Sequence, residues 1–592
     1  MNPNMSRRAP LVAALLLGIA STGHAGQTCD ESLGLQTGAT APAQDAFACG
    51  TSARATGVRS AAFGTRAVAS DEEALAVGAD SVASGFHSSA LGALAVASGR
   101  GATASGWRAQ ATGDLSTATG NSAVASGANS TANGRAAQAT GSNSTAVGQD
   151  AQATNVNTTA VGQGSRATGE DATAVGQGSV ASGFHSSALG ALAVASGRGA
   201  TATGWQAQAT GDLSTATGNS AVASGANSTA TGRAAQATGV NSTATGQGAV
   251  ASGEDATATG QGARASGFHA TATGALANAS GRGATATGWQ AAATGDLSTA
   301  TGNNAVASGA NSTATGRAAS ATGANSTATG QGAVASGASS TANGQGAVAS
   351  SVNTTAVGQG ATASDEDALA AGQGAQATGF HSTALGTQST ASGRGATASG
   401  WQARATGELS NAFGNSAVAS GANSTAIGRG ANAAAANSVA LGNGAVAGSS
   451  NSVAIGNGSL ANRDNSVSVG GVGSERQITN VAAGTARTDA ANWGQVTDYV
   501  NDLRAYTDRR FFETDERIDK LGAMNAAMST MLSSAAGIQK ENRIAAGVGF
   551  AGGESAFAVG YQRQLGESAT FTLGGSFTDD ESSAGLGFGY GW

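Results

Sequence analysis

A seven-residue pattern of glycine and small residues runs through most of the chain. From Gly50 to Gly470 in steps of seven, 54 of the 61 positions are glycine, and the register never slips. The exceptions are Asp71, Asn155, Ser351, Asp365, Ala435, Ser449 and Arg463. Because Gly, Asn and Asp best tolerate a positive φ, we interpret each step as a left-handed backbone turn.

Short strands are predicted between these turns. Alanine stands two residues before nearly every glycine of the pattern, with Val, Thr or Ser beside it, as in residues 116–120. Such alternation with β-branched neighbours is typical of strands. Successive heptads differ, so the repeating unit is often fourteen residues with two strands. A heptad coiled coil is excluded, because each glycine would cost a helix about 1 kcal/mol and no Leu or Ile seam exists.

The predicted fold class is therefore mostly β. Stacked two-stranded coils make a parallel β-roll, and about thirty coils of about 4.8 Å each extend about 145 Å. We assign this head to residues 57–470. A single roll so rich in Ala and Ser has a poor core, so several chains are expected to associate.

A longer repeat is superimposed on the seven-residue one. Gly-Phe-His occurs four times, at spacings of 98, 84 and 112 residues, and each copy is followed by Gly-Arg-Gly-Ala-Thr-Ala and a tryptophan. The candidate ligand contacts are Phe86, His87, Trp107, Phe184, His185, Trp205, Phe268, His269, Trp289, Phe380, His381 and Trp401. The aromatic residues are either structural wedges or exposed ligand contacts. The histidines are turn residues or, alternatively, contribute one per chain to a three-fold metal site.

The pattern stops after Gly470. Residues 471–492 are irregular and are assigned to a neck, and a helical spacing of apolar residues follows from Trp493. The spaced positions are Val496, Val500, Leu503, Thr507, Phe511, Thr514, Ile518, Leu521, Asn525, Met528 and Leu532. Their steps of four and three predict a short coiled-coil stalk over residues 493–540, in which polar Asn525 sets register or strand number. An amphipathic helix on a globular domain is the alternative.

The last fifty residues alternate with a period of two. Four segments place large apolar side chains on one face and small residues on the other, as in membrane β-barrels. The predicted lipid-facing residues are Val548, Phe550, Phe557, Val559, Tyr561, Phe571, Leu573, Phe577, Leu586, Phe588, Tyr590 and Trp592. Four strands cannot close a barrel, and lipid does not tolerate open edges. We therefore predict that residues 541–592 of three chains form one twelve-stranded barrel with three helices in its pore.

The amino-terminal residues predict a secreted protein. Arg7-Arg8, an apolar run over residues 10–20 and small residues before a cleavage site indicate a signal peptide over residues 1–25. A buried helix is the alternative. In the following segment, residues 26–56, Cys29 and Cys49 would reach an oxidising compartment and pair either within one chain or between chains.

The composition argues against most other classes of function. Charged residues make up 11% of the chain, the net charge is −7 and only three prolines occur, which excludes collagen and disfavours disorder and a nucleic-acid partner. Two cysteines and five histidines leave little material for metal or thiol chemistry. We expect no catalytic residues, metal site or cofactor, and no enzyme, because the mature histidines occur only in near-identical cassettes.

Taken together, these segments resemble the YadA-like trimeric autotransporter adhesins (type Vc secretion). Residues 437–442 and 451–456 match the family's head motif, residues 476–484 and 488–492 resemble its neck, and the last fifty or so residues resemble its anchor. The stalk is unusually short. The neck's usual Val-Asn-x-x-Gln-Leu appears as Ala-Asn-Trp-Gly-Gln-Val over residues 491–496.

This resemblance implies a homotrimer with a left-handed parallel β-roll head. It also implies an outer-membrane anchor that requires the barrel-insertion machinery and exports the head through its own pore to the cell surface. The expected partners are host extracellular matrix or cell-surface receptors and sister cells. The alternative is a structural surface layer or an ice-binding β-solenoid. A uniform Thr face would indicate that alternative, whereas Thr, Val, Gln, Ser and Leu mix at equivalent positions of the repeat.

Overall fold

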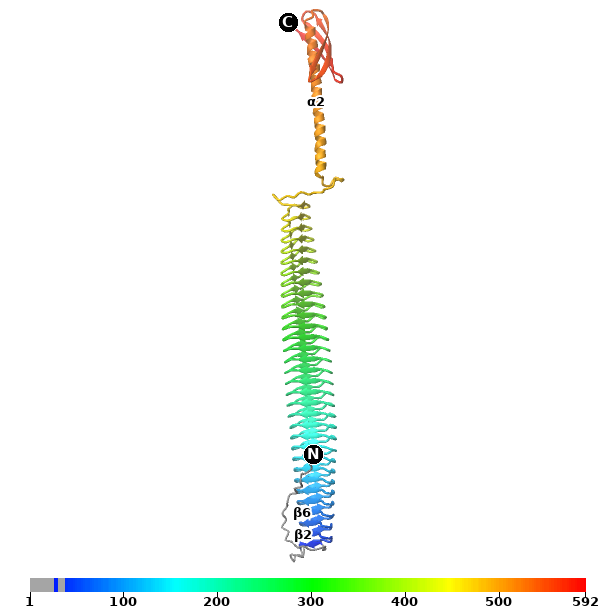
Figure 1. Cartoon of the computed structure of the whole chain (residues 1–592), viewed down its shortest axis with the longest axis vertical. Helices are drawn as coiled ribbons and strands as arrows, with labels where there is room; N and C mark the ends of the chain where they lie inside the picture. The colour runs from blue at the N-terminus through cyan, green and yellow to red at the C-terminus, as the bar shows by residue number, and fades with distance from the viewer. Residues whose placement is uncertain (1–25, 30–37) are drawn as a thin grey trace, which may run out of the picture. The chain divides into compact units, whose positions relative to one another are not determined.

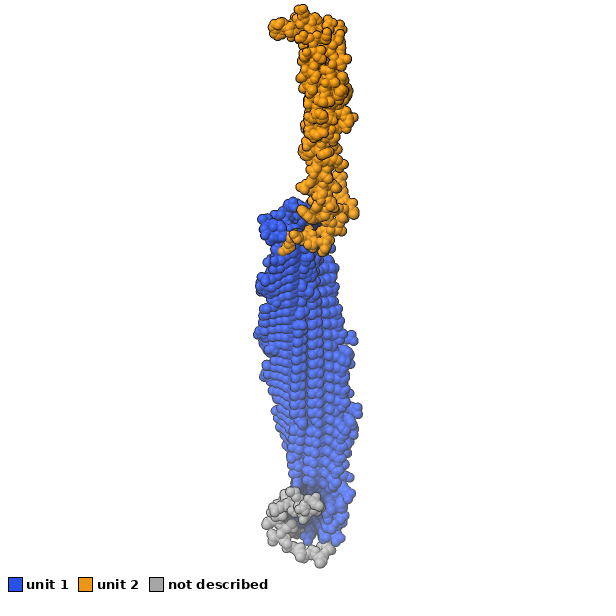
Figure 2. Space-filling view, turned by 45° about the horizontal axis from the view of Figure 1, so that its top comes forward, with its two compact units in different colours: residues 1–475 blue, residues 476–592 orange. Residues whose placement is uncertain are grey.

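The structure is a computed structural model that describes residues 26–29 and 38–592. The predicted signal peptide, residues 1–25, lies outside the described residues. The described chain forms two compact units divided between Glu475 and Arg476 (Figure 2).

The first unit is a parallel β-solenoid of stacked two-stranded coils (Figure 1). Three-residue strands alternate with two-residue strands, as in β12 (Thr117–Thr119) and β13 (Val124–Ala125). Each strand pairs with the strand fourteen residues further on, so Thr117 lies opposite Thr131. The fourteen-residue coil is thereby confirmed.

Two sheets run along the solenoid. The even sheet contains the even-numbered strands from β2 (Phe47–Cys49) to β62 (Val467–Ser468), with β1 (Gln27–Thr28) paired to β2. The odd sheet contains the odd-numbered strands from β3 (Arg54–Ala55) to β61 (Leu460–Ala461). The core between the sheets is made of fully buried alanines, such as Ala118 on β12 and Ala125 on β13. Because each contributes only a methyl group, the core of one chain is thin.

The glycines that recur every seven residues lie in two different kinds of turn. We name the turns after odd strands edge A and the turns after even strands edge B. Glycines of edge B from Gly50 to Gly456, such as Gly120, have φ between +105° and +141°, a region that side chains rarely adopt. Gly113 on edge A has no positive φ, but a Cβ there would lie 2.1 Å from the carbonyl oxygen of Gly127 in the next coil.

A left-handed turn recurs every seven residues, as predicted, but on edge A it does not lie at the glycine of the pattern. On both edges, the residue near φ +55° comes two positions after the glycine, as at Leu115 and Ser122. All seven non-glycine exceptions in the pattern stand on edge A. None of the seven has a positive φ, whereas edge B keeps glycine throughout.

The second unit begins with residues 476–492, which contain no helix or strand, and continues into the helix α2 (Trp493–Ala536). Asn492 caps α2 by accepting a hydrogen bond from the Gln495 backbone, while the Gln495 side chain accepts one from the Asn492 backbone. The Gln495 side chain also bonds both backbone groups of Gly484. The Asn and Gln that the neck motif retains are thus the residues that join the neck to the helix.

Four antiparallel strands follow α2 in sequential order. They are β63 (Asn542–Ala551), β64 (Glu554–Leu565), β65 (Ala569–Phe577) and β66 (Ser582–Tyr590). Helix α2 packs on β63 and β64 through Ala523, Met524, Ala527, Met531 and Ala535, all of which are buried. In the part of the chain that is described, no helix has both the length and the apolar character needed to cross a bilayer.

Candidate adhesive surface and membrane anchor

The four Phe-His pairs lie on edge A of the solenoid. Each histidine occupies the left-handed position of its turn, with φ of 55–57°, and contacts the preceding phenylalanine with ring centroids 3.9 Å apart and ring planes 28–44° from parallel. The histidine side chains are 48–55% exposed. The structure therefore presents each Phe-His pair at the surface as one aromatic unit.

Charged side chains flank this unit in the neighbouring coils. One coil earlier, a carboxylate lies 2.9–3.1 Å from the histidine Nε2, as between Asp171 and His185. One coil later, an arginine guanidinium lies 5.6–5.8 Å from the phenylalanine ring centroid, as Arg198 does over Phe184. At this distance the cation is attracted to the ring face. Acid, aromatic pair and arginine thus follow one another along edge A in each cassette.

A leucine completes each cassette one coil beyond the arginine. These residues are Leu115, Leu213, Leu297 and Leu409, which hold left-handed φ of 52–55° and are 51–64% exposed. A bulky residue in this conformation is strained, and Asn is the usual occupant of the same column elsewhere, as at Asn227. The sequence pattern alone does not single out these leucines. Aligning the chain in fourteen-residue rows would have exposed them as replacements in a column of asparagines.

Between cassettes, edge A carries a ladder of asparagines. Asn143 Nδ2 donates to Asn157 Oδ1 at 3.0 Å, and Asn157 donates to Asp171 Oδ1 at 2.8 Å. Asp171 is the carboxylate that contacts His185. The ladder therefore connects the cassette to the coils before it and fixes the orientation of the acid.

The four tryptophans lie on edge B, at the opposite side of the coil. They are 45–48% exposed, and leucines in left-handed turns precede the first three by one coil, at Leu94, Leu192 and Leu276. Within one chain the structure does not bring the Trp and Phe-His parts of a cassette together. No group of three or more potential metal ligands occurs among the described residues.

The even sheet carries a regular array that our sequence analysis missed. Ten successive even strands from β24 (Thr201–Thr203) to β42 (Thr327–Thr329) read Thr-Ala-Thr. The expectation of mixed residues at equivalent positions is therefore wrong for this part of the sheet. The outward residues form two threonine columns because the strand repeats every fourteen residues in register.

The anchor sheet separates large from small side chains as predicted from its period. The register places Phe557 opposite Phe577 and Leu573 opposite Leu586 on the face away from α2. The other face meets the helix through glycine: a Cβ on Gly547 or Gly549 would lie 2.2–2.4 Å from backbone atoms of α2.

A charged cluster joins α2 to the β65–β66 loop. The buried Lys520 ammonium lies 2.8 Å from Glu516, 2.9 Å from Asp580 and 3.3 Å from Asp579. The hydrogen bond from Lys520 holds the pKa of Asp580 below its usual range. These ion pairs therefore connect α2 to the loop between β65 and β66.

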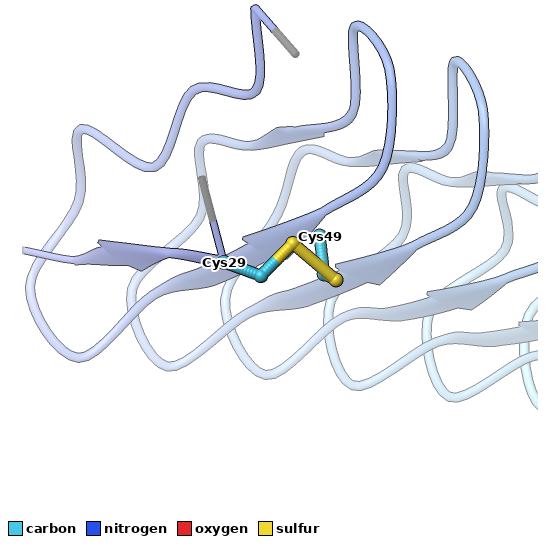
Figure 3. Close-up of a disulfide and its surroundings, with 2 residues drawn as sticks. All are labelled: Cys29 and Cys49. Carbon is cyan, nitrogen blue, oxygen red and sulfur yellow. A yellow bond between two sulfur atoms is a disulfide. The ribbon is translucent and has the colours of Figure 1, made fainter. Parts of the chain in front are cut away.

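In the structure, Cys29 and Cys49 form a disulfide within the chain (Figure 3). It links the ends of the paired strands β1 and β2, with the two Cα atoms 4.8 Å apart. The bond therefore connects the first described segment to the first coil of the solenoid.

A β-solenoid, a capped helix and an antiparallel sheet packed against that helix follow one another along the chain. This order of parts is that of a surface-displayed autotransporter. Comparison with known families supports each part. The YadA head domain repeat matches successive and overlapping segments from residue 55 to residue 471. The coiled stalk of trimeric autotransporter adhesin matches residues 477–514, and the YadA-like membrane anchor domain matches residues 535–592.

The chain belongs to the family of YadA-like trimeric autotransporter adhesins. It is a non-enzymatic homotrimer with an outer-membrane anchor and a stalk and head at the cell surface. Autotransporter adhesin EhaG of Escherichia coli O157:H7 is 34% identical over 129 residues, which are 21% of this chain and 8% of EhaG. The collagen-binding domain of Yersinia adhesin YadA is 28% identical, with a TM-score of 0.17, over 33% of this chain and 86% of that domain.

Proposed function

We propose that three chains close one twelve-stranded barrel in the outer membrane, after insertion by the barrel-insertion machinery. The barrel exports the heads, which attach the cell to host matrix or receptors and to sister cells. The proposal of a three-chain barrel rests on one observation: part of the sheet face beside α2 is not covered by the helix of its own chain. Beside α2, a groove of about 460 Å³ is lined by Met528, Leu532, Gly585 and Gly587 among others.

The glycines of β66 support a neighbouring helix as the occupant of this groove. Gly547 and Gly549 are needed because α2 of the same chain touches them, whereas a Cβ on Gly585 or Gly587 would meet nothing within 4 Å. Ile518, Leu521 and Leu532 of the predicted seam are exposed in one chain. Three-fold assembly would cover these residues with neighbouring helices and close the free edges of β63 and β66.

The adhesive contacts are assigned to the twelve Phe, His and Trp residues of the cassettes. Two observations support this assignment: these residues stand on exposed turns, and the cassette occurs four times in each chain. A trimer would therefore carry twelve copies of the cassette. Weak contacts repeated along one rod give strong attachment through avidity.

The attachment test replaces all four cassette tryptophans by alanine in the full chain displayed on cells. A control replaces Gln149, Gln247, Gln331 and Gln373, which occupy the same column of edge B between cassettes, by alanine. We expect the tryptophan variant alone to lose attachment to immobilised matrix proteins and to sister cells at equal display. Equal attachment by both variants would remove the tryptophans from the adhesive surface.

The Thr-Ala-Thr array favours one second candidate, an ice-binding or surface-layer role, because such surfaces need regular hydroxyl columns. This candidate requires the even sheet to face solvent in the trimer. Outer-membrane vesicles carrying the full chain would then inhibit ice recrystallisation, and Thr257→Lys and Thr285→Lys would abolish the effect. Vesicles that did not inhibit ice recrystallisation would exclude this candidate, and the adhesive role would remain as the proposed function.

A further inference from the structure

The two sheets of the head differ in charge. No strand of the even sheet in the described chain contains a charged residue, whereas Arg54, Arg166, Arg264 and Arg404 stand exposed on the odd sheet. Apart from Val467, the first residue of β62, the exposed large apolar residues of the even strands also share one column. They are Phe63, Val77, Val175, Leu189, Val357, Leu385, Phe413, Ile427, Leu441 and Ile455, each the last residue of its strand. An uncharged sheet with an apolar column is the sheet that a homotrimer would bury.

If the even sheet of each chain faces the three-fold axis, the two edges of each solenoid lie at its flanks. Neighbours in a cyclic trimer meet through unlike surfaces, so edge A of one protomer faces edge B of the next. Rotation about an axis parallel to the solenoids does not change height. Each cassette would therefore meet the same cassette of its neighbour.

The heights of the cassette residues interleave across this boundary. Each coil advances about 4.8 Å, so Phe184, Arg198 and Leu213 of edge A follow one another at intervals of about 4.8 Å. On edge B, Leu192 and Trp205 lie about half a coil after Phe184 and Arg198 respectively. Leu192 of one protomer thus reaches the level between Phe184 and Arg198 of the next, and Trp205 reaches the level between Arg198 and Leu213.

We propose that each cassette is a composite of two protomers, in which the Leu-Trp turns of one chain pack against the Phe-His-Arg-Leu turns of the next. Each of the three boundaries would carry four such clusters, and in the fourth Gln388 takes the place of the leucine that precedes the tryptophan. This proposal deepens the proposed function by naming a second copy of the chain as the partner of these residues. Its geometry depends on the trimer but not on the adhesive role of the cassettes.

The composite accounts for two features that one chain leaves unexplained. Leucines occupy strained left-handed turns at Leu115, Leu213, Leu297 and Leu409, although over half of each side chain is exposed. The tryptophans lie on the opposite edge, although they recur in the same cassettes. An apolar partner across the boundary would stabilise both sets of residues.

Disulfide trapping in the full chain on cells tests the geometry. The variants are Leu213→Cys alone, Trp205→Cys alone, and both together, examined after mild oxidation on non-reducing gels. We expect covalent dimers and trimers only from the double variant, because each edge meets its unlike edge. A matched control combines Leu213→Cys with Trp289→Cys, which lies six coils beyond Trp205, and is expected to stay uncrosslinked.

The proposal fails if the displayed double variant gives only monomers, or if either single variant crosslinks as well as the double. A second measurement avoids new cysteines: acrylamide quenching of the purified trimer carrying Trp493→Phe and Trp592→Phe. The remaining tryptophans are nearly half exposed in one chain. We expect quenching several-fold weaker than for free tryptophan, and quenching as strong as for a freely exposed residue would overturn the composite.

The attachment assay separates this proposal from the proposed function. If the double cysteine variant crosslinks and the variant lacking the four tryptophans attaches as the wild type does, the composite cassette is supported and its adhesive role is excluded. Lost attachment without crosslinking would keep the adhesive role and refute the composite.

Discussion

Substituting one glycine of edge B by alanine should open the solenoid at that coil. Gly246 has a φ of +127°, and a Cβ there would lie 2.6 Å from the carbonyl oxygen of Gly260 in the next coil. The backbone strain is worth about 1–3 kcal/mol. Displacing the coil also weakens the bond from the Gly246 N–H to the Thr231 carbonyl, at a cost of about 1–3 kcal/mol. We expect Gly246→Ala to destabilise its coil by about 2–6 kcal/mol, the sum of these two contributions.

Gly248 provides a matched control two residues away. Its φ is +66°, but a Cβ there would meet nothing within 4 Å, so Gly248→Ala should cost only about 1–2 kcal/mol. Because repeat proteins open locally, proteolysis of full-length trimers should cut Gly246→Ala near the altered coil at least about ten times faster than Gly248→Ala. Equal cleavage rates would refute the argument that contact between coils, rather than φ alone, requires glycine.

Three further changes test the anchor and the stalk. Val559→Lys should lower trimer insertion by about 2–4 kcal/mol, measured as gel-shifted trimer in outer membranes, while Leu460→Lys in the head should not. Lys520→Gln should lower the temperature at which trimers dissociate in SDS. Because the pKa of Asp580 is lowered in the folded chain, its contribution is present at neutral pH and lost as pH falls through that folded value. Acid should therefore weaken the wild-type anchor more than the Lys520→Gln anchor. Gln495→Ala should cost about 1 kcal/mol of helix stability, measured by thermal loss of the helical circular dichroism signal.

Much of the candidate site could be predicted from the sequence, because its residues recur at multiples of fourteen. The Phe, His and Trp positions follow directly from that spacing. The sequence shows Arg198 and its equivalents only as part of the repeat, and it does not single out Leu213 and its equivalents as part of the site. Their significance depends on φ and on exposure at a turn, and neither is visible from residue type in a chain where small residues dominate.

The sequence by itself determined the fourteen-residue coil, the order of head, neck, helix and anchor, and the two faces of the anchor strands. These features are encoded by local period, which sets the side of an element on which each residue lies. Only the tertiary structure decided why Gly113 and Gly120 are both glycine, because one avoids a neighbouring coil and the other adopts an unusual φ. It alone also decided which residue of each turn takes the left-handed φ, as Leu115 and Ser122 do, since that depends on how successive coils stack.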